Sequence, residues 1–244
     1  MSLNITGLLV LCCIAIVSSD WIFPDAVQFD LSAALNKNCG QSPYIDRFKP
    51  EDGRIFENPW LVLFRHPEEQ EWFCQGTLIT DRHIMTTAIC SEAIVVNETI
   101  IILGEYDRKD DPDYVMPVCL PLTPIIPSLI HAPTPYNTLW TGEHRVPKQI
   151  RMHYMSQDTC QARMRNLLLL QEGQICARYA KPIDVRITSG SGSPLVIEHH
   201  DRTFQFGILS IGLPEATYLE PYVYVNISTH IKWIHDTLVD EFKQ

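Results

Sequence analysis

The cysteines are the residues whose type and number most directly indicate chemistry. Six of the eight cysteines follow the N-terminal apolar segment: Cys39, Cys74, Cys90, Cys119, Cys160 and Cys176. An even number of cysteines in an exported chain indicates disulfides, although their spacing alone leaves many pairings open. Metal coordination is the competing chemistry, but no two of the six have the Cys-x-x-Cys spacing of a zinc site. We therefore expect three disulfides, no metal and no cofactor.

The N-terminal segment indicates the compartment. Leu8 to Val17 is a short apolar run, followed by small residues up to Ser19. Such a run is too short to span a bilayer and is typical of the core of a signal peptide. A buried first strand is the other interpretation, and a chain start this apolar rarely packs in that way. We predict that residues 1–19 are a signal peptide and that the mature protein is secreted and extracellular.

The composition and net charge limit the classes of molecule that the protein is expected to bind. Hydrophobic residues make up 45% of the chain, which is enough to bury a core. The formal net charge of −10 argues against nucleic acid or an anionic membrane as a partner. Two tripeptides, beginning at Asn97 and at Asn226, match the N-glycosylation signal and are candidate acceptors where exposed.

The elements that must position these residues are mostly short β-strands. Apolar and β-branched runs separated by turns lie at residues 60–64, 73–80, 83–89, 93–96, 99–106, 204–212 and 222–227. This spacing predicts a sandwich or barrel rather than an α/β fold. The C-terminus differs, because Ile231, Ile234, Leu238 and Phe242 recur at helical spacing after Ser228 or Thr229 as N-cap. We predict an all-β fold with one C-terminal α-helix.

Several stretches, taken in order, resemble the chymotrypsin-like serine proteases. Residues 74–90 (CQGTLITDRHIMTTAIC) resemble C-G-G-x-L-I-x-x-x-x-V-L-T-A-A-H-C, and residues 189–196 (SGSGSPLV) resemble G-D-S-G-G-P-L-V. Residues 207–212 (GILSIG) resemble G-I-V-S-W-G, and residues 222–234 resemble the closing V-Y-T-x-V-x-x-Y-x-x-W-I. The resemblance implies two six-stranded Greek-key β-barrels of the trypsin-like fold. It also implies an N-terminal extension over 20–46 and an incomplete protease domain over 47–244.

The same resemblance implies specific pairings and a specificity pocket. The implied disulfides are Cys39–Cys119, Cys74–Cys90 and Cys160–Cys176. Val185 would lie at the floor of the primary specificity pocket. Ser210, Ile211 and Gly212 would form its wall, with Ile211 in place of the family's tryptophan. The resemblance therefore implies an apolar or partly filled pocket.

The catalytic triad of the family is incomplete in this sequence. Catalysis there needs a nucleophilic serine, a histidine base and an aspartate that orients the histidine. Ser191 occupies the nucleophile position, but Ile89 stands where the base is expected and cannot accept a proton. The strand that would carry the acid is missing between Tyr106 and Cys119. We interpret the other histidines near these motifs as loop residues rather than as a substitute base: His66, His83, His199 and His200.

Two further departures concern activation and the first barrel. Gly190 replaces the aspartate whose carboxylate pairs with the new N-terminus after cleavage, and Arg47 to Glu51 replaces the R-I-V-G-G cleavage sequence. A buried ammonium without its carboxylate is costly, so joint loss indicates that the switch is not used. Twelve residues separate Tyr106 from Cys119, too few for about two strands of the barrel. Either the first barrel is open or rearranged, or the sequence comes from a truncated gene model.

These departures favour a protein that binds rather than cleaves. We predict a secreted, non-catalytic serine protease homologue of the insect type, acting as adaptor, decoy or cofactor in a proteolytic cascade, in immunity or in reproductive fluid. Its partners would be proteases, their substrates or their inhibitors. One alternative is a serine-type endopeptidase that keeps weak or unrecognised activity through Ser191. The other is a non-functional or mis-spliced product.

Overall fold

The described residues form two antiparallel β-sheets in this computed structural model. It describes residues 39–41, 44, 52–55, 57–68, 72–107, 136–140, 146–164, 167–182, 190–199, 202–212 and 219–241. All of them belong to the unit Leu31–Gln244. The predicted signal peptide lies outside the described residues, so this prediction stays open. None of the described helices is long and apolar enough to cross a membrane.

The first sheet has the strand order β3-β2-β1-β4. Its strands are β1 (Leu61–Arg65), β2 (Trp72–Leu78), β3 (Ile84–Met85) and β4 (Ile100–Leu103). Val62 pairs with Leu103 and Phe64 pairs with Ile101, so the four side chains share one face. Val62 and Phe64 are buried, whereas Ile101 is 48% and Leu103 38% exposed. This face is therefore covered at β1 and open at β4, as expected of a first barrel with fewer strands.

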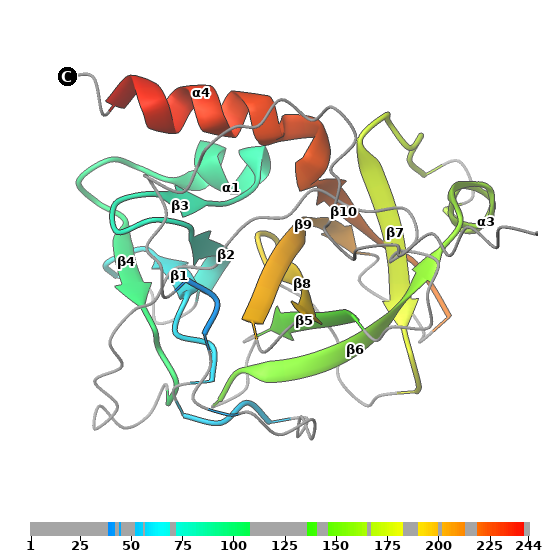
Figure 1. Ribbon diagram of the computed structural model, residues 1–244, viewed down its shortest axis with the longest axis horizontal. Coiled ribbons are helices and arrows are strands. Elements are labelled where there is room, and N and C mark those ends of the chain that lie inside the picture. Colours follow the sequence, from blue (N-terminus) through cyan, green and yellow to red (C-terminus); the bar gives the residue numbers. More distant parts are fainter. Residues whose placement is uncertain are drawn as a thin grey trace, which may run out of the picture. The chain divides into compact units, whose positions relative to one another are not determined.

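The second sheet closes into a barrel in the order β10-β7-β6-β5-β8-β9 (Figure 1). Its strands are β5 (Tyr136–Trp140), β6 (Lys148–Met155), β7 (Gln174–Tyr179), β8 (Pro194–His199), β9 (Arg202–Gly212) and β10 (Tyr222–Asn226). Closure pairs every strand on both sides and leaves no free edge. The core includes Tyr179 and Tyr222, whose hydroxyl oxygens lie 2.7 Å apart. The predicted all-β, trypsin-like architecture is confirmed.

The helices of the described residues are short apart from the last one. They are α1 (Ala88–Ala93), α3 (Gln157–Arg163), the 3-10 helix η2 (Ile227–His230) and α4 (Ile231–Glu241). The predicted C-terminal helix is confirmed, and its Ile234 and Leu238 pack in a buried cluster with Met85 of β3 and Ile208 of β9. Together these contacts tie α4 to both sheets.

The predicted N-cap of the C-terminal helix is wrong. The chain passes directly from β10 into η2, and the Asn226 side chain accepts a hydrogen bond from the Ser228 backbone N–H at 2.9 Å. Asn226 is thus the N-cap of η2, which leads directly into α4, and it lies ahead of the predicted caps Ser228 and Thr229. The apolar period locates a helix well, but the cap depends on where the preceding strand ends.

Of the strands predicted in the first half, the one over 83–89 is confirmed only in part and the one over 93–96 is wrong. The strand over 83–89 ends at Met85, because the Thr87 hydroxyl accepts from the Cys90 N–H and starts α1. The strand over 93–96 is a turn, in which the Val95 N–H donates to Thr99 Oγ1 at 3.0 Å. Threonine side chains that bond nearby backbone compete with sheet pairing. Two of the apolar side chains there remain exposed, Val95 at 44% and Val96 at 79%.

A disulfide ties α1 to a strand, and another ties α3 to a strand. Cys74 of β2 is joined to Cys90 of α1, and Cys160 of α3 to Cys176 of β7. These are two of the pairs that the resemblance implies. Cys39 is also disulfide-bonded. Because Cys119 lies outside the described residues, the pairing Cys39–Cys119 stays a prediction.

Candidate functional site

Ser191 lies in a tight turn that precedes β8. Gly192 has a φ of 90°. A Cβ at Gly192 would lie 1.8 Å from the Gln75 carbonyl oxygen, so only glycine lets the turn approach β2 this closely. The Ser193 N–H donates to the Gly190 carbonyl at 2.9 Å and closes the turn. The glycine therefore fixes where the Ser191 side chain stands.

Gln75 anchors this turn to the first sheet. Its N–H donates to the Ser191 carbonyl at 2.9 Å, and its side-chain oxygen accepts from the Ser193 hydroxyl at 3.1 Å. The Thr86 hydroxyl donates to the Gln75 carbonyl at 2.7 Å. Gln75 and Ser193 are both buried. Two hydrogen bonds therefore hold the turn against β2, and the bond from Thr86 fixes Gln75 itself.

Sequence reasoning missed the Gln75–Ser193 contact, although a signal was present. Gln75 stands at the second position of C-G-G, and Ser193 at the last glycine of G-D-S-G-G-P. Each is a polar residue where the motif has glycine. The two departures are 118 residues apart in sequence and meet in one hydrogen bond.

The Ser191 hydroxyl donates to the Ser210 carbonyl oxygen on β9, at 3.2 Å. No other hydrogen bond of this hydroxyl is found in the part of the chain that the structure describes. A main-chain carbonyl orients a hydroxyl but does not take its proton, whereas an imidazole does both. The arrangement can hold the serine but cannot activate it by this contact.

Ile89, at the position that the resemblance gives to the base, lies on α1 and is 58% exposed. Its neighbour Cys90 places Sγ 3.5 Å from the Ser191 carbonyl oxygen. As half of a disulfide, this sulfur has no proton to donate, so the contact is one of packing. The structure thus brings α1 against the Ser191 turn. At the position of the base it presents only a hydrocarbon side chain.

His83 and His66, two described histidines near these motifs, contact other side chains. His83 Nδ1 lies 2.6 Å from Thr80 Oγ1 in the turn between β2 and β3. The His66 ring stacks on Phe73 with 4.6 Å between centroids. His199 is the last residue of β8 and not a loop residue as predicted, and its side chain lies outside the described residues. The whole of His200 lies outside them too, as do Asp110, Asp111 and Asp113. Within the described chain, no histidine is hydrogen-bonded to Ser191.

The predicted specificity pocket is described only along one wall. Ser210, Ile211 and Gly212 form the end of β9, and Val185 lies outside the described residues. A Cβ at Gly212 would lie 2.5 Å from the Tyr222 ring, so glycine leaves room for that ring. Ile211 is 36% exposed and presents an apolar surface. An apolar pocket remains a prediction.

The activation switch has no carboxylate in the described turn, because Gly190 is buried and has no side chain. Upstream, Glu57 is fully buried and its carboxylate accepts from the Arg54 N–H and guanidinium at 2.8 and 3.0 Å. The guanidinium lies 3.8 Å over the Tyr44 ring. Arg54 is therefore held in a local cluster rather than presented on a free loop.

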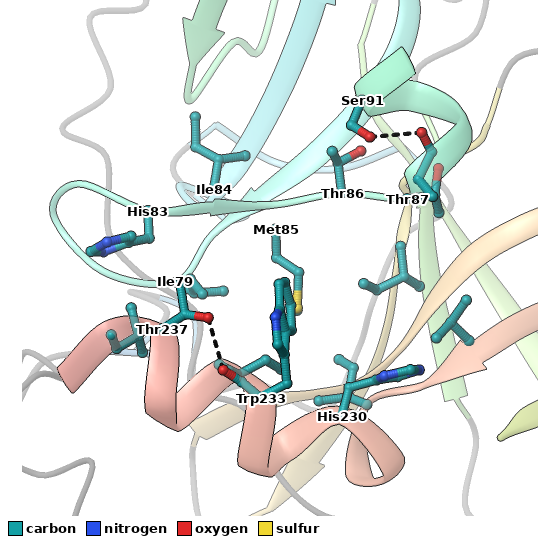
Figure 2. A pocket seen from close by; sticks show the side chains of 16 residues that line it. Ile79, His83, Ile84, Met85, Thr86, Thr87, Ser91, His230, Trp233 and Thr237 are labelled. Atoms are coloured by element: carbon teal, nitrogen blue, oxygen red, sulfur yellow. Dashed lines mark hydrogen bonds between the residues drawn. The ribbon is translucent and has the colours of Figure 1, made fainter. Parts of the chain in front are cut away.

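A mainly apolar cavity of about 540 Å³ lies between β3, α1 and α4. Met85 of β3 and Trp233 of α4 extend toward one another across it, with His83 and His230 at its edge (Figure 2). Ser191 is not among its lining residues, so this cavity is separate from the nucleophile position. Among the residues described, no cluster of side chains could hold a metal ion.

Comparison with known proteins finds a family model and several insect proteins that are similar to this chain. A family model described as Trypsin matches residues 108–234, just over half of the chain, including β5 to β10. The CLIP domain-containing serine protease B10 of Anopheles gambiae is 23% identical, over 88% of this chain and 76% of that protein. Phenoloxidase-activating factor 3 of Holotrichia diomphalia is 23% identical, over 93% and 80%. The phenoloxidase-activating enzyme of Bombyx mori is 26% identical, over 52% and 32%.

Proposed function

Because this chain belongs to the trypsin family of serine proteases, we propose that it is a secreted homologue that acts by binding proteins instead of cleaving them. Its role would be that of an adaptor, decoy or cofactor in a proteolytic cascade. The partners would be a protease of that cascade, its substrate or its inhibitor. The disulfides support an extracellular location, because such bonds persist in oxidising compartments.

The hydrogen bond from Ser191 to Ser210 carries the proposal. A serine protease needs its hydroxyl beside an imidazole, and here the acceptor is a backbone carbonyl. Ile89 at the position of the base supports the same conclusion. Loss of the base and the acid together lowers the rate of such enzymes by several powers of ten.

The relatives support a cascade as the setting. Two of them carry the names phenoloxidase-activating factor and phenoloxidase-activating enzyme. A homologue that shares the fold of such proteins could bind the partners of a cascade without cleaving them. The binding partner should therefore be sought in an insect proteolytic cascade.

Labelling of Ser191 tests the absence of activity. We expect a fluorophosphonate probe to leave the folded, disulfide-bonded chain unlabelled while it labels trypsin in the same tube. The Ser191→Ala variant is the matched control, because it removes only the hydroxyl. Labelling of the natural chain that disappears in Ser191→Ala would instead favour the alternative of an active endopeptidase.

A cascade assay tests the binding role. Purified chain added to insect haemolymph that contains a triggerable phenoloxidase cascade should change the rate of phenoloxidase activation as its concentration rises. Ser191→Ala should act like the natural chain, since binding does not need the hydroxyl. An effect present in the natural chain and absent in Ser191→Ala would contradict the proposal.

A further inference from the structure

We infer that Asn97, and not Asn226, carries an N-linked glycan, and that this glycan shields the open apolar end of the first sheet. The inference rests on the proposed secretion, because N-glycans are added in the secretory pathway. Both asparagines lie in the tripeptide that the transferase recognises. Their surroundings in the fold differ.

Asn97 stands at the exposed tip of the turn between α1 and β4. Its φ is 71°, in the left-handed region that asparagine tolerates better than most residues. The N–H groups of Glu98 and Thr99 donate to the Val95 carbonyl at 3.0 and 2.9 Å, so the turn holds itself without using the Asn97 side chain. Within the described structure this amide makes no hydrogen bond. An attached sugar would displace none of these contacts.

Asn226 is placed in the opposite way. It is half-buried at the end of β10, where its N–H donates to the Gly173 carbonyl at 2.7 Å. Its side-chain oxygen accepts from both the N–H and the hydroxyl of Ser228, at 2.9 and 2.6 Å. The residue that follows, Ile227, is buried. A bulky glycan here would have to leave from a side chain that caps η2 between a strand and a helix.

The position of Asn97 also gives its glycan a role. Val95 and Val96 directly precede it and are exposed, and β4, which begins three residues after it, carries the exposed side chains of Ile101 and Leu103. In the described part of the sheet, β4 is an edge strand. Exposed apolar edge strands are templates for pairing with another chain. A large polar glycan beside this edge would block such an approach.

Site-resolved mass spectrometry tests the acceptor. The full chain is expressed in insect cells once with its own leader and once with a supplied leader, and glycopeptides are measured in the medium and in the cells. The Asn97 peptide should carry one glycan and the Asn226 peptide none. Asn97→Asp, which keeps the backbone conformation accessible, should lose that glycan, whereas Asn226→Asp, which keeps an acceptor oxygen for Ser228, should leave it unchanged.

The two proposals fail in distinguishable ways. An exported chain with an unmodified Asn97, or with a glycan on Asn226, overturns this inference and leaves the binding role untouched. A chain that its own leader does not export, but that is glycosylated at Asn97 with the supplied leader, overturns the proposed secretion alone.

Sedimentation tests the shielding role. Asn97→Asp should form more oligomer and aggregate than the natural chain at equal concentration, with an unchanged thermal midpoint. Adding Ile101→Lys to Asn97→Asp should reverse this increase in oligomer and aggregate, because a charge on an edge strand prevents pairing. Equal sedimentation of the natural chain and of Asn97→Asp would overturn the shielding role.

Discussion

The Ser191 hydroxyl donates a hydrogen bond to the main-chain carbonyl oxygen of Ser210, 3.2 Å away. In a working triad this proton goes to an imidazole that an aspartate orients. Here the hydroxyl is oriented by a group that cannot accept its proton, and the neighbouring helix offers Ile89. The turn that carries Ser191 is nevertheless firmly held, through Gly192 and Gln75. The described residues therefore fix the position of Ser191, and none of them brings an acid–base group to its hydroxyl.

Replacement of the base alone should not restore activity. We expect Ile89→His to leave hydrolysis of ester and amide substrates at the background rate, because the sequence predicts no strand that would carry the acid to orient the imidazole. Ile89 is exposed, so the free energy of unfolding should change by less than about 0.5 kcal/mol. Substrate assays and thermal unfolding on the same sample check both expectations. Turnover in Ile89→His that disappears on adding Ser191→Ala would contradict this prediction.

Gly192 should be among the residues least tolerant of change. Gly192→Ala puts a Cβ against the Gln75 carbonyl at a backbone φ of 90°, so we expect a loss of more than about 3 kcal/mol in the free energy of unfolding. Gly207→Ala is the matched control, because its nearest neighbour is the Leu195 side chain at 3.2 Å. Urea unfolding measures both. A smaller loss in Gly192→Ala than in Gly207→Ala would refute the tight approach of the turn.

The contact between Gln75 and Ser193 should appear as a coupling energy. Gln75→Ala and Ser193→Ala each remove one partner of a buried hydrogen bond, and the double variant removes both. We expect the sum of the two single losses in the free energy of unfolding to exceed the loss in the double variant by about 1 kcal/mol, the usual value of a buried hydrogen bond. A double-mutant cycle in urea measures this difference. Strict additivity would mean that the two side chains do not stabilise one another.

The sequence predicts best those elements that local patterns determine. The strands β1, β2, β9 and β10 follow their apolar runs, and α4 follows its helical period. The strand predicted over 83–89 stops at Met85 and the one over 93–96 does not form. The reason is that the hydroxyls of Thr87 and Thr99 bond nearby backbone, which an apolar pattern does not report.

The site was predicted less completely, and for a different physical reason. Ser191 and Ile89 are located by motif position, and the structure brings α1 beside the Ser191 turn. The partner of the Ser191 hydroxyl is a backbone carbonyl on β9, and a carbonyl leaves no mark in a sequence. Gln75 and Ser193 do leave a mark, as two polar residues at glycine positions. Only the fold shows that they meet.

Stability should fall at alkaline pH through the tyrosine pair in the second barrel. Burial raises the pKa of Tyr222 above its ordinary value of 10.0, and the hydrogen bond from Tyr179 offsets part of this rise. Above about pH 10 the unfolded chain therefore loses a proton that the folded chain keeps. This contribution to stability is fully present below pH 10 and is lost as the pH rises through the folded-state pKa.

The Tyr222→Phe variant isolates this effect, because it removes the titrating hydroxyl and keeps the ring in the core. At neutral pH we expect a loss of about 1 kcal/mol, since the Tyr179 hydroxyl loses this partner. Between about pH 9 and 11 the free energy of unfolding should fall less steeply in Tyr222→Phe than in the natural chain. Urea titrations across that range measure both slopes. Parallel slopes would mean that Tyr222 titrates alike in the folded and unfolded states.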